Sequence, residues 1–243
     1  MCQELILSWE DVKTHQWFPI GRFSKSNNVY SFSYIQGVIQ AKQQGFSGLA
    51  SMQDFEQTYH YGDIFPLLKN RIFNKSRADR DEFLDWLNIK SENSDFEELA
   101  KTGGIKATDN LQLFPVPIKK DNKYILEFFV QGTRHLPPNT QKRIEKLNKN
   151  EKIFLCADLE NPQDENALIL RTEDPVEIVG YCPKFFAKDF KKLFDLSKSS
   201  FTIKIKKVNK NAPKQLELLC EITCDWHKDF SPFLEDKFKS INQ

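Results

Sequence analysis

Apolar and polar residues alternate along the first part of the chain in the pattern of short β-strands. Residues 5–9 form an apolar run, and in residues 30–34 the aromatic residues Tyr30, Phe32 and Tyr34 alternate with serines. A period of two predicts strands with one buried face. Further along, apolar residues recur every three or four positions, which predicts helices. The predicted helices cover residues 37–44, 63–73 and 78–87.

The next helix has both of its ends marked in the sequence. Ser94 and Glu97 have the spacing of a capping box, and Gly103-Gly104 is a helix-end signal. A strand-like run then leads into residues 115–122, where two prolines precede charged residues, as in a linker. We therefore predict an α+β protein of two domains. Their expected bounds are residues 1–117, a small α+β domain, and residues 118–243.

Strand-like runs dominate the second half of the chain. They cover residues 124–130, 153–156, 167–170, 179–182, 200–208 and 215–224. A helix is expected over residues 139–147, and another one after Pro183. The latter has an apolar stripe of five residues, Phe185, Phe186, Phe190, Leu193 and Phe194, and an opposite face with four lysines, Lys184, Lys188, Lys191 and Lys192. This pattern predicts a helix with one buried face.

Three short motifs in this half occur in the order and spacing of a known family. They are Gly132-Thr133-Arg134-His135, then Asn161-Pro162-Gln163-Asp164-Glu165-Asn166-Ala167, then Gly180-Tyr181-Cys182-Pro183-Lys184. Residues 123–226 thereby resemble a HIRAN domain. The resemblance implies a small antiparallel β-barrel with helices as the fold of this half. One position departs from the family pattern, since the aromatic residue usual between proline and aspartate is Gln163.

The resemblance also implies a site for single-stranded DNA or DNA ends. Single-strand binding needs cations for phosphates and aromatic faces for bases. Carried over residue by residue, Arg134 and Lys184 would hold phosphate, while His135 and Tyr181 would stack on bases. Asp164 would accept a hydrogen bond from a terminal hydroxyl, whereas Gln163 cannot stack as an aromatic ring would. The predicted nucleic-acid-binding set is Arg134, His135, Gln163, Asp164, Tyr181, Lys184, Lys188 and Lys191.

Structural interpretations of the same residues stay open at this stage. The lysines after Lys184 could simply form the solvated face of an amphipathic helix, and Lys204 and Lys206 could protect an exposed strand. Tyr181 could belong to the core. Arg134 could pair with Asp164 for structural reasons.

The first half has a looser resemblance, to the small N-terminal subdomain of HipA-type toxin kinases. The stretches that carry it are residues 19–23, 30–34 and 64–72. No kinase motifs follow. The resemblance implies a protein-interaction subunit of a toxin–antitoxin system, which would bind a helix-turn-helix or kinase partner through residues 1–117. This is the alternative to a DNA-binding function.

Composition agrees with a globular protein and says little about partners. The net charge is +1, but residues 181–214 contain ten lysines against two aspartates. No apolar run is long enough for a membrane span, and the N-terminus lacks a signal-peptide pattern, so we expect a cytoplasmic protein without a membrane partner. The five cysteines are scattered. Because Cys220 and Cys224 fall on one face of a strand, buried thiols are favoured over a zinc site with His227.

Catalytic motifs are absent from the sequence. We find no phosphate-binding loop of the P-loop type, no serine nucleophile motif and no zinc-protease motif. The acidic residues near Asp164 could hold a divalent ion, but solvated turn residues are the commoner explanation. We therefore expect a non-enzymatic DNA-binding protein, without cofactor or metal, in DNA processing, repair or prokaryotic defence.

Overall fold

A computed structural model describes residues 4–26, 29–90, 95–162 and 164–241. The chain divides into two compact units. The first consists of Met1–Arg80, Ser91–Val116 and Ser231–Gln243, and the second of Asp81–Lys90 and Pro117–Phe230. The predicted division at residue 117 differs from this in two segments. Residues 81–90 belong to the second unit, and residues 231–243 return to the first.

The first unit is built on a five-stranded sheet with the order β4-β3-β2-β1-β5. Its strands are β1 (Glu4–Glu10), β2 (Trp17–Ser26), β3 (Val29–Tyr34), β4 (Tyr59–Tyr61) and β5 (Leu111–Pro115). All neighbouring strands are antiparallel. Its helical elements are α1 (Gly37–Gln43), α2 (Pro66–Lys69), α4 (Asp95–Thr102) and η3 (Asp236–Phe238).

Aromatic side chains fill the core of the first unit. Phe32 and Tyr34 of β3 are buried, as their alternation with serines predicts, and Phe23 lies 4.6 Å from Phe32 between ring centroids. The C-terminal segment adds Phe233 and Phe238, which pack on Phe114 of β5. These contacts explain why residues 231–243 belong to this unit.

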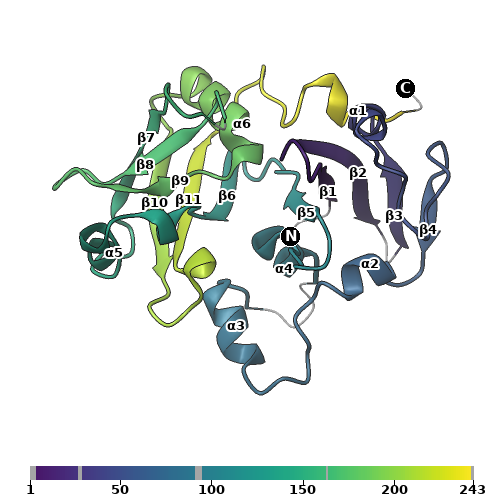
Figure 1. Ribbon diagram of the computed structural model, residues 1–243. Coiled ribbons are helices and arrows are strands. Elements are labelled where there is room, and N and C mark those ends of the chain that lie inside the picture. The colour runs from purple at the N-terminus through teal and green to yellow at the C-terminus, as the bar shows by residue number, and fades with distance from the viewer. Residues whose placement is uncertain (1–3, 27–28, 91–94, 163, 242–243) are drawn as a thin grey trace. The chain divides into compact units, whose positions relative to one another are not determined.

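The second unit contains a six-stranded antiparallel sheet with the order β6-β11-β10-β7-β8-β9 (Figure 1). Its strands are β6 (Lys123–Phe129), β7 (Lys152–Ala157), β8 (Leu168–Arg171), β9 (Ile178–Tyr181), β10 (Thr202–Val208) and β11 (Leu218–Asp225). Its helical elements are α3 (Arg80–Trp86), η1 (Thr133–His135), α5 (Pro138–Ile144), α6 (Lys184–Leu196) and η2 (Lys214–Leu216). The sheet curls, which confirms the predicted α+β class and antiparallel barrel-like second half.

Helix α6 packs its apolar face on β6. The ring of Phe190 lies 5.3 Å from that of Phe128 and 6.5 Å from that of Tyr124, between centroids. Phe194, predicted in the same stripe, is instead 39% exposed. The stripe covers more of the helix circumference than the sheet can bury, because positions 186, 190 and 193 already fill the contact.

Residues 81–90 complete the second unit from a distant part of the sequence. Leu87 and Ile89 form one apolar cluster with Phe129, Leu216 and Leu219. The predicted apolar stripe of the helix is therefore real, and its buried residues pack within the second unit. Burial of such a cluster offsets the cost of ordering a remote segment.

Most predicted elements are present with shifts of a few residues at their ends. The helix predicted over residues 63–73 is reduced to the four residues of α2, because Pro66 sets its start and the chain turns after Asn70. The capping-box residue Ser94 lies outside the described residues. Gly103, with φ +70°, ends α4 as predicted.

Candidate nucleic-acid interface

The six-stranded sheet of the second unit has β6 and β9 at its edges. Gln131, just after β6, and Tyr181, the last residue of β9, are joined by two backbone hydrogen bonds, and we call this junction the closure. Gln131 N donates to Tyr181 O at 2.8 Å, and Tyr181 N donates to Gln131 O at 2.9 Å. Gly180 permits this approach. Its φ is +136°, and a Cβ at this position would lie 2.5 Å from the carbonyl oxygen of Gln131. The closure therefore needs glycine at position 180.

The same closure presents Arg134 and His135. Gly132, in the left-handed region at φ +76°, turns the chain from the closure into η1. Thr133 is buried and its hydroxyl donates to the carbonyl oxygen of Lys214 at 3.1 Å. Arg134 and His135 are exposed, and Arg134 Nε donates to His135 Nε2 at 2.9 Å. This bond orients both side chains and requires an unprotonated Nε2 on His135.

Hydrogen bonds within the β7–β8 turn fix its polar residues. Asp164 N donates to Asn161 Oδ1 at 3.1 Å, and Asn166 N donates to Asp164 Oδ1 at 2.8 Å. Asn161 Nδ2 in turn donates to Asp158 Oδ2 at 3.0 Å. Asn161 and Asp164 thus act as the turn residues that the sequence predicts. Gln163 lies outside the described residues.

Tyr181 connects the turn to the closure. Its half-buried ring carries a hydroxyl that donates to Asp158 Oδ2 at 2.9 Å. Hydrogen bonds from Asn161 and Tyr181 lower the pKa of Asp158, and the bond to Asp158 raises the pKa of Tyr181. Tyr181 is therefore neither a core residue nor a freely rotating surface residue, because one edge of it is held in place.

Helix α6 begins directly after the closure, with Pro183 as its N-cap and exposed Lys184 as its first residue. The first turn contains no acidic residue. A cation there is unfavourable, since the helix N-terminus carries partial positive charge. The helix dipole therefore does not account for a lysine at position 184, whose Nζ lies 5.4 Å from the ring centroid of Phe185.

Five of the predicted site residues come from segments that the closure and its turn bring to one region. We call them the closure surface, and they are Arg134, His135, Asp164, Tyr181 and Lys184. Ala167 N donates to Asp164 O at 3.0 Å and Cys182 N donates to Leu168 O at 2.9 Å, so Asp164 lies close to the start of α6. Its charge contributes, after burial, to raising the pKa of Cys182 to about 12. Within the described ranges no ion pair joins Arg134 to Asp164. Lys188 and Lys191 lie further along α6, both exposed.

The comparisons with known proteins bear on this region. Residues 123–227 match the family model of the HIRAN domain. We call the matched residues the HIRAN domain, after the family that they resemble. The match covers less than half of the chain, and it contains every residue of the closure surface.

Two solved structures resemble part of the chain. The crystal structure of the HIRAN domain of human HLTF is 22% identical, with 41% of this chain and 74% of that chain covered and a TM-score of 0.32. A crystal structure of a protein from Lactobacillus plantarum is 14% identical, with 43% and 99% covered and a TM-score of 0.33. Both scores are low, so the family match carries the assignment. No curated protein matches the chain.

Nothing in these comparisons supports the resemblance of residues 1–117 to HipA-type kinases, and it stays a prediction. In the part of the chain that is described, no helix combines the length and apolar character that crossing a membrane requires.

The remaining candidate chemistry in the HIRAN domain is structural. Cys182, Cys220 and Cys224 are buried free thiols, and burial raises the pKa of Cys220 to about 12. His227 lies 3.6 Å from Asp229, between Nδ1 and Oδ2. Among the described residues, no group of three or more His, Cys, Asp or Glu side chains could hold a metal ion. Asp158 and Asp164 accept hydrogen bonds within the turn.

Sequence reasoning missed two residues of this region. Asp158 accepts the hydroxyl of Tyr181, and Asn166 faces α6 across an open hollow. Both lie in a polar turn whose residue types predict a turn and nothing more. Only the motif that contains Asn166 could have drawn attention to it.

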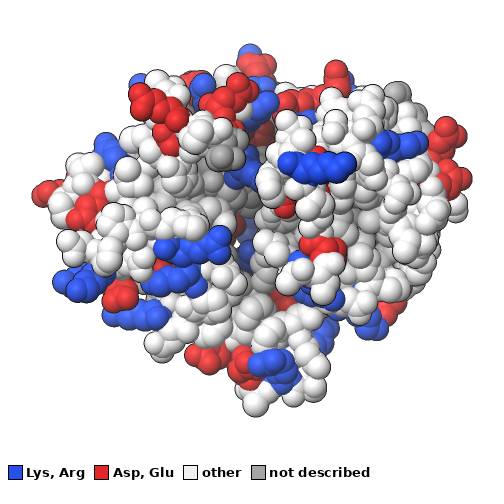
Figure 2. Space-filling model, in the orientation of Figure 1, with Lys and Arg blue, Asp and Glu red and all other residues white. Residues whose placement is uncertain are grey.

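Figure 2 shows Lys and Arg side chains gathered over the part of this unit where Figure 1 places α5, which directly follows η1.

Proposed function

We propose that the HIRAN domain binds single-stranded DNA or DNA ends at the closure surface, without catalysis. The observation that carries the proposal is the closure itself. Two hydrogen bonds between Gln131 and Tyr181 bring a cationic segment, an aromatic residue and the start of a lysine-bearing helix to one place. Single-stranded nucleic acid is recognised by this combination of cations and aromatic faces.

Each residue has a distinct role in this proposal. Arg134 and Lys184 bind phosphates as cations, and Lys188 and Lys191 extend the positive surface along α6. His135 and Tyr181 offer ring faces to bases. Asp164 accepts a hydrogen bond from a terminal hydroxyl of the strand, and its carboxylate is oriented by the bond from Asn166 N.

The biological setting follows from the ligand. A small protein that holds single strands or ends fits DNA processing, repair or prokaryotic defence, and we propose that it works there as a non-catalytic subunit. In the part described, no observation on the first unit favours a toxin–antitoxin partner over any other protein.

Fluorescence anisotropy with labelled single-stranded and duplex DNA at two salt concentrations tests the proposal. The wild-type protein should bind single strands in a salt-sensitive way. Arg134→Ala with Lys184→Ala should lower the affinity at least about tenfold and reduce the salt slope by about 1.4, since each phosphate contact contributes about 0.7 for single strands.

The matched control removes two lysines from the outer face of the sheet. Lys152 and Lys204 are exposed and pair with each other in register between β7 and β10. Lys152→Ala with Lys204→Ala should leave affinity and slope unchanged. If the closure-surface variant binds as tightly as the wild type, the site assignment is wrong. Circular single strands and strands with a 3′-phosphate separate end recognition from binding along the backbone.

A further inference from the structure

An open hollow lies between the β7–β8 turn and the exposed face of α6. It has a volume of about 300 Å³, and its lining consists of Asn166, Lys188, Lys191, Lys192, Asp195 and Leu196. One lining residue contacts the closure surface, because Asn166 N donates to the side chain of Asp164 at 2.8 Å. Three of the six lining residues are cations, and one more is an amide that can donate hydrogen bonds.

Two of the lysines on α6, Lys191 and Lys192, form no ion pair within the described part of the chain. In the described residues, Lys198 contacts only the ring of Phe194. Cations three or four residues apart repel each other on a helix. By contrast, α4 of the first unit places Glu97 four residues before Lys101, with Nζ and Oε1 3.5 Å apart. The face of α6 therefore carries a charge that an external anion would neutralise.

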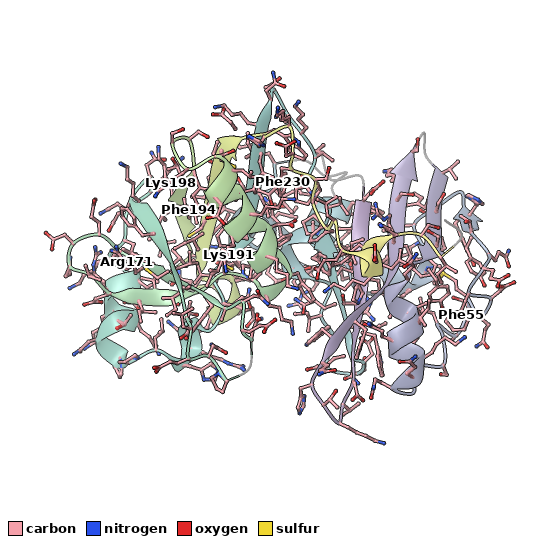
Figure 3. The ribbon with its side chains drawn as sticks, turned by 90° about the horizontal axis from the view of Figure 1, so that it is seen from above. Phe55, Arg171, Lys191, Phe194, Lys198 and Phe230 are labelled. Atoms are coloured by element: carbon pink, nitrogen blue, oxygen red, sulfur yellow. The ribbon has the colours of Figure 1, made fainter. Side chains whose placement is uncertain are left out.

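An exposed aromatic ring lies among these lysines. Phe194 meets Phe201 edge-on at 5.3 Å between ring centroids, and Lys198 Nζ lies 5.7 Å from the Phe194 centroid. Figure 3 shows Lys191, Phe194 and Lys198 in a row along α6 and the segment that follows it. The edge contact fixes the ring, and 39% of the residue stays exposed. A fixed, exposed ring between cations is the arrangement that single-strand binding uses.

We propose that the strand bound at the closure surface continues along α6 toward its C-terminal end. Lys191, Lys192 and Lys198 bind successive backbone phosphates, and Phe194 supports a base. This inference rests on the proposed function and adds the path of the strand and a second binding segment. The 13 residues of α6 span about 18 Å at a rise of 1.5 Å per residue, which is longer than a single nucleotide step.

Binding of oligothymidylates of 4, 8 and 12 nucleotides to the full-length protein tests the path. For the wild type, affinity should rise at least about tenfold from 4 to 12 nucleotides. Lys191→Ala with Lys192→Ala and Lys198→Ala should remove this rise, leave the 4-nucleotide affinity unchanged, and reduce the salt slope for 12 nucleotides by about 2. Phe194→Leu keeps an apolar side chain against Phe201; it should lower the 12-nucleotide affinity and leave the salt slope unchanged.

The control variant removes three exposed lysines elsewhere, Lys149, Lys152 and Lys204, and should keep the length dependence. Circular dichroism melts verify that each variant is folded. If the wild type binds 4 and 12 nucleotides equally, the path is wrong and the proposed function stands. If the α6 variant loses affinity equally at both lengths, the lysines act at the strand end and the path is again wrong. If no length binds, both proposals are wrong.

Discussion

Two groups of lysines in the same unit have opposite surroundings: Lys206 and Lys207 of β10, and Lys191, Lys192 and Lys198 on α6 or just after it. Lys206 lies between Glu221, at 2.6 Å, and Glu127, at 3.3 Å, and Lys207 lies 2.7 Å from Asp85, all measured between Nζ and a carboxylate oxygen. No carboxylate lies within ion-pair distance of Lys191, Lys192 or Lys198 in the described part of the chain. The first group is engaged in ion pairs within the fold, and the second is the group that we propose binds a ligand.

The ion pairs of Lys206 with Glu127 and Glu221, which we call the β10 network, have a clear structural cause. Glu127 and Glu221 are directly opposite each other on β6 and β11, and like charges in this position are destabilising. A register shift between Ile205 and Lys207 leaves Lys206 as an extra residue that reaches both carboxylates. Burial alone would lower the pKa of Lys206, but the hydrogen bonds and charges of Glu221 and Glu127 raise it overall. The number of lysines in a segment therefore does not locate a binding surface.

The largest effect is expected from a change that breaks the closure between Gln131 and Tyr181. In Gly180→Ala, the new Cβ would meet Val130 Cγ1 and Gln131 O, each at 2.5 Å, and alanine disfavours φ +136°. We expect a loss of about 3 kcal/mol in the free energy of unfolding of the second unit, with loss of DNA binding. Urea unfolding measures the first effect and anisotropy the second.

The control for this change is Gly62→Ala in the first unit, where no atom lies within 4 Å of the added Cβ. It should leave both the unfolding midpoint and the affinity nearly unchanged. A Gly180→Ala protein as stable as the wild type would show that the close approach at Gln131 is not required for the fold.

Reversing charge on α6 should weaken binding without lowering stability. Lys191→Glu with Lys192→Glu places carboxylates where phosphates would bind, so we expect an affinity loss of about tenfold or more for a 12-nucleotide strand. The melting temperature should stay within a few degrees of the wild type. Lys149→Glu with Lys152→Glu is the matched control, and equal losses in both variants would mean that only net charge matters.

Removing Lys206, the cation of the β10 network, should lower stability and leave DNA binding unchanged. Lys206→Ala leaves Glu127 and Glu221 facing each other, and we expect a destabilisation of about 1 kcal/mol at neutral pH with unchanged DNA affinity. Because the folded-state pKa of Lys206 is raised, its contribution is complete below the ordinary lysine value and disappears only at more alkaline pH. Lys204→Ala, at an exposed position of the same strand, is the control.

The smallest expected effect concerns the bond between Tyr181 and Asp158. Tyr181→Phe removes one of the hydrogen bonds that lower the pKa of Asp158, so this pKa should rise toward its ordinary value. The stabilisation that comes from the lowered pKa is present above the ordinary value and is lost as pH falls through the folded-state value. A carboxyl-carbon NMR titration measures the shift. An unchanged pKa would mean that the hydroxyl does not bond to Asp158 in solution.

The sequence predicts the HIRAN motifs well, because their residues have local conformational reasons. Gly180 and Gly132 have positive φ, and Asn161 and Asp164 bond within their own turn. These requirements show in the residue types themselves, so the segments of the closure surface could be predicted, although the bond from Tyr181 to Asp158 could not.

Contacts between segments that are distant in the sequence cannot be predicted from residue types in this way. The apolar stripe around Leu87 predicts a buried face but not that this face packs on Leu216 and Leu219. Likewise, helical spacing assigns Phe194 to the stripe, although the width of the contact with β6 leaves it exposed. The domain bounds and the α6 surface therefore required the structure.

The central claim is that one surface of the HIRAN domain, from the closure along α6, binds single strands. Chemical-shift mapping of backbone amides during titration with a 12-nucleotide single strand tests it most directly. The account predicts shifts that concentrate in residues 131–135, 164–167 and 181–198, with little change along β10 and β11. Shifts concentrated in β10 and β11, or in the first unit, would contradict it.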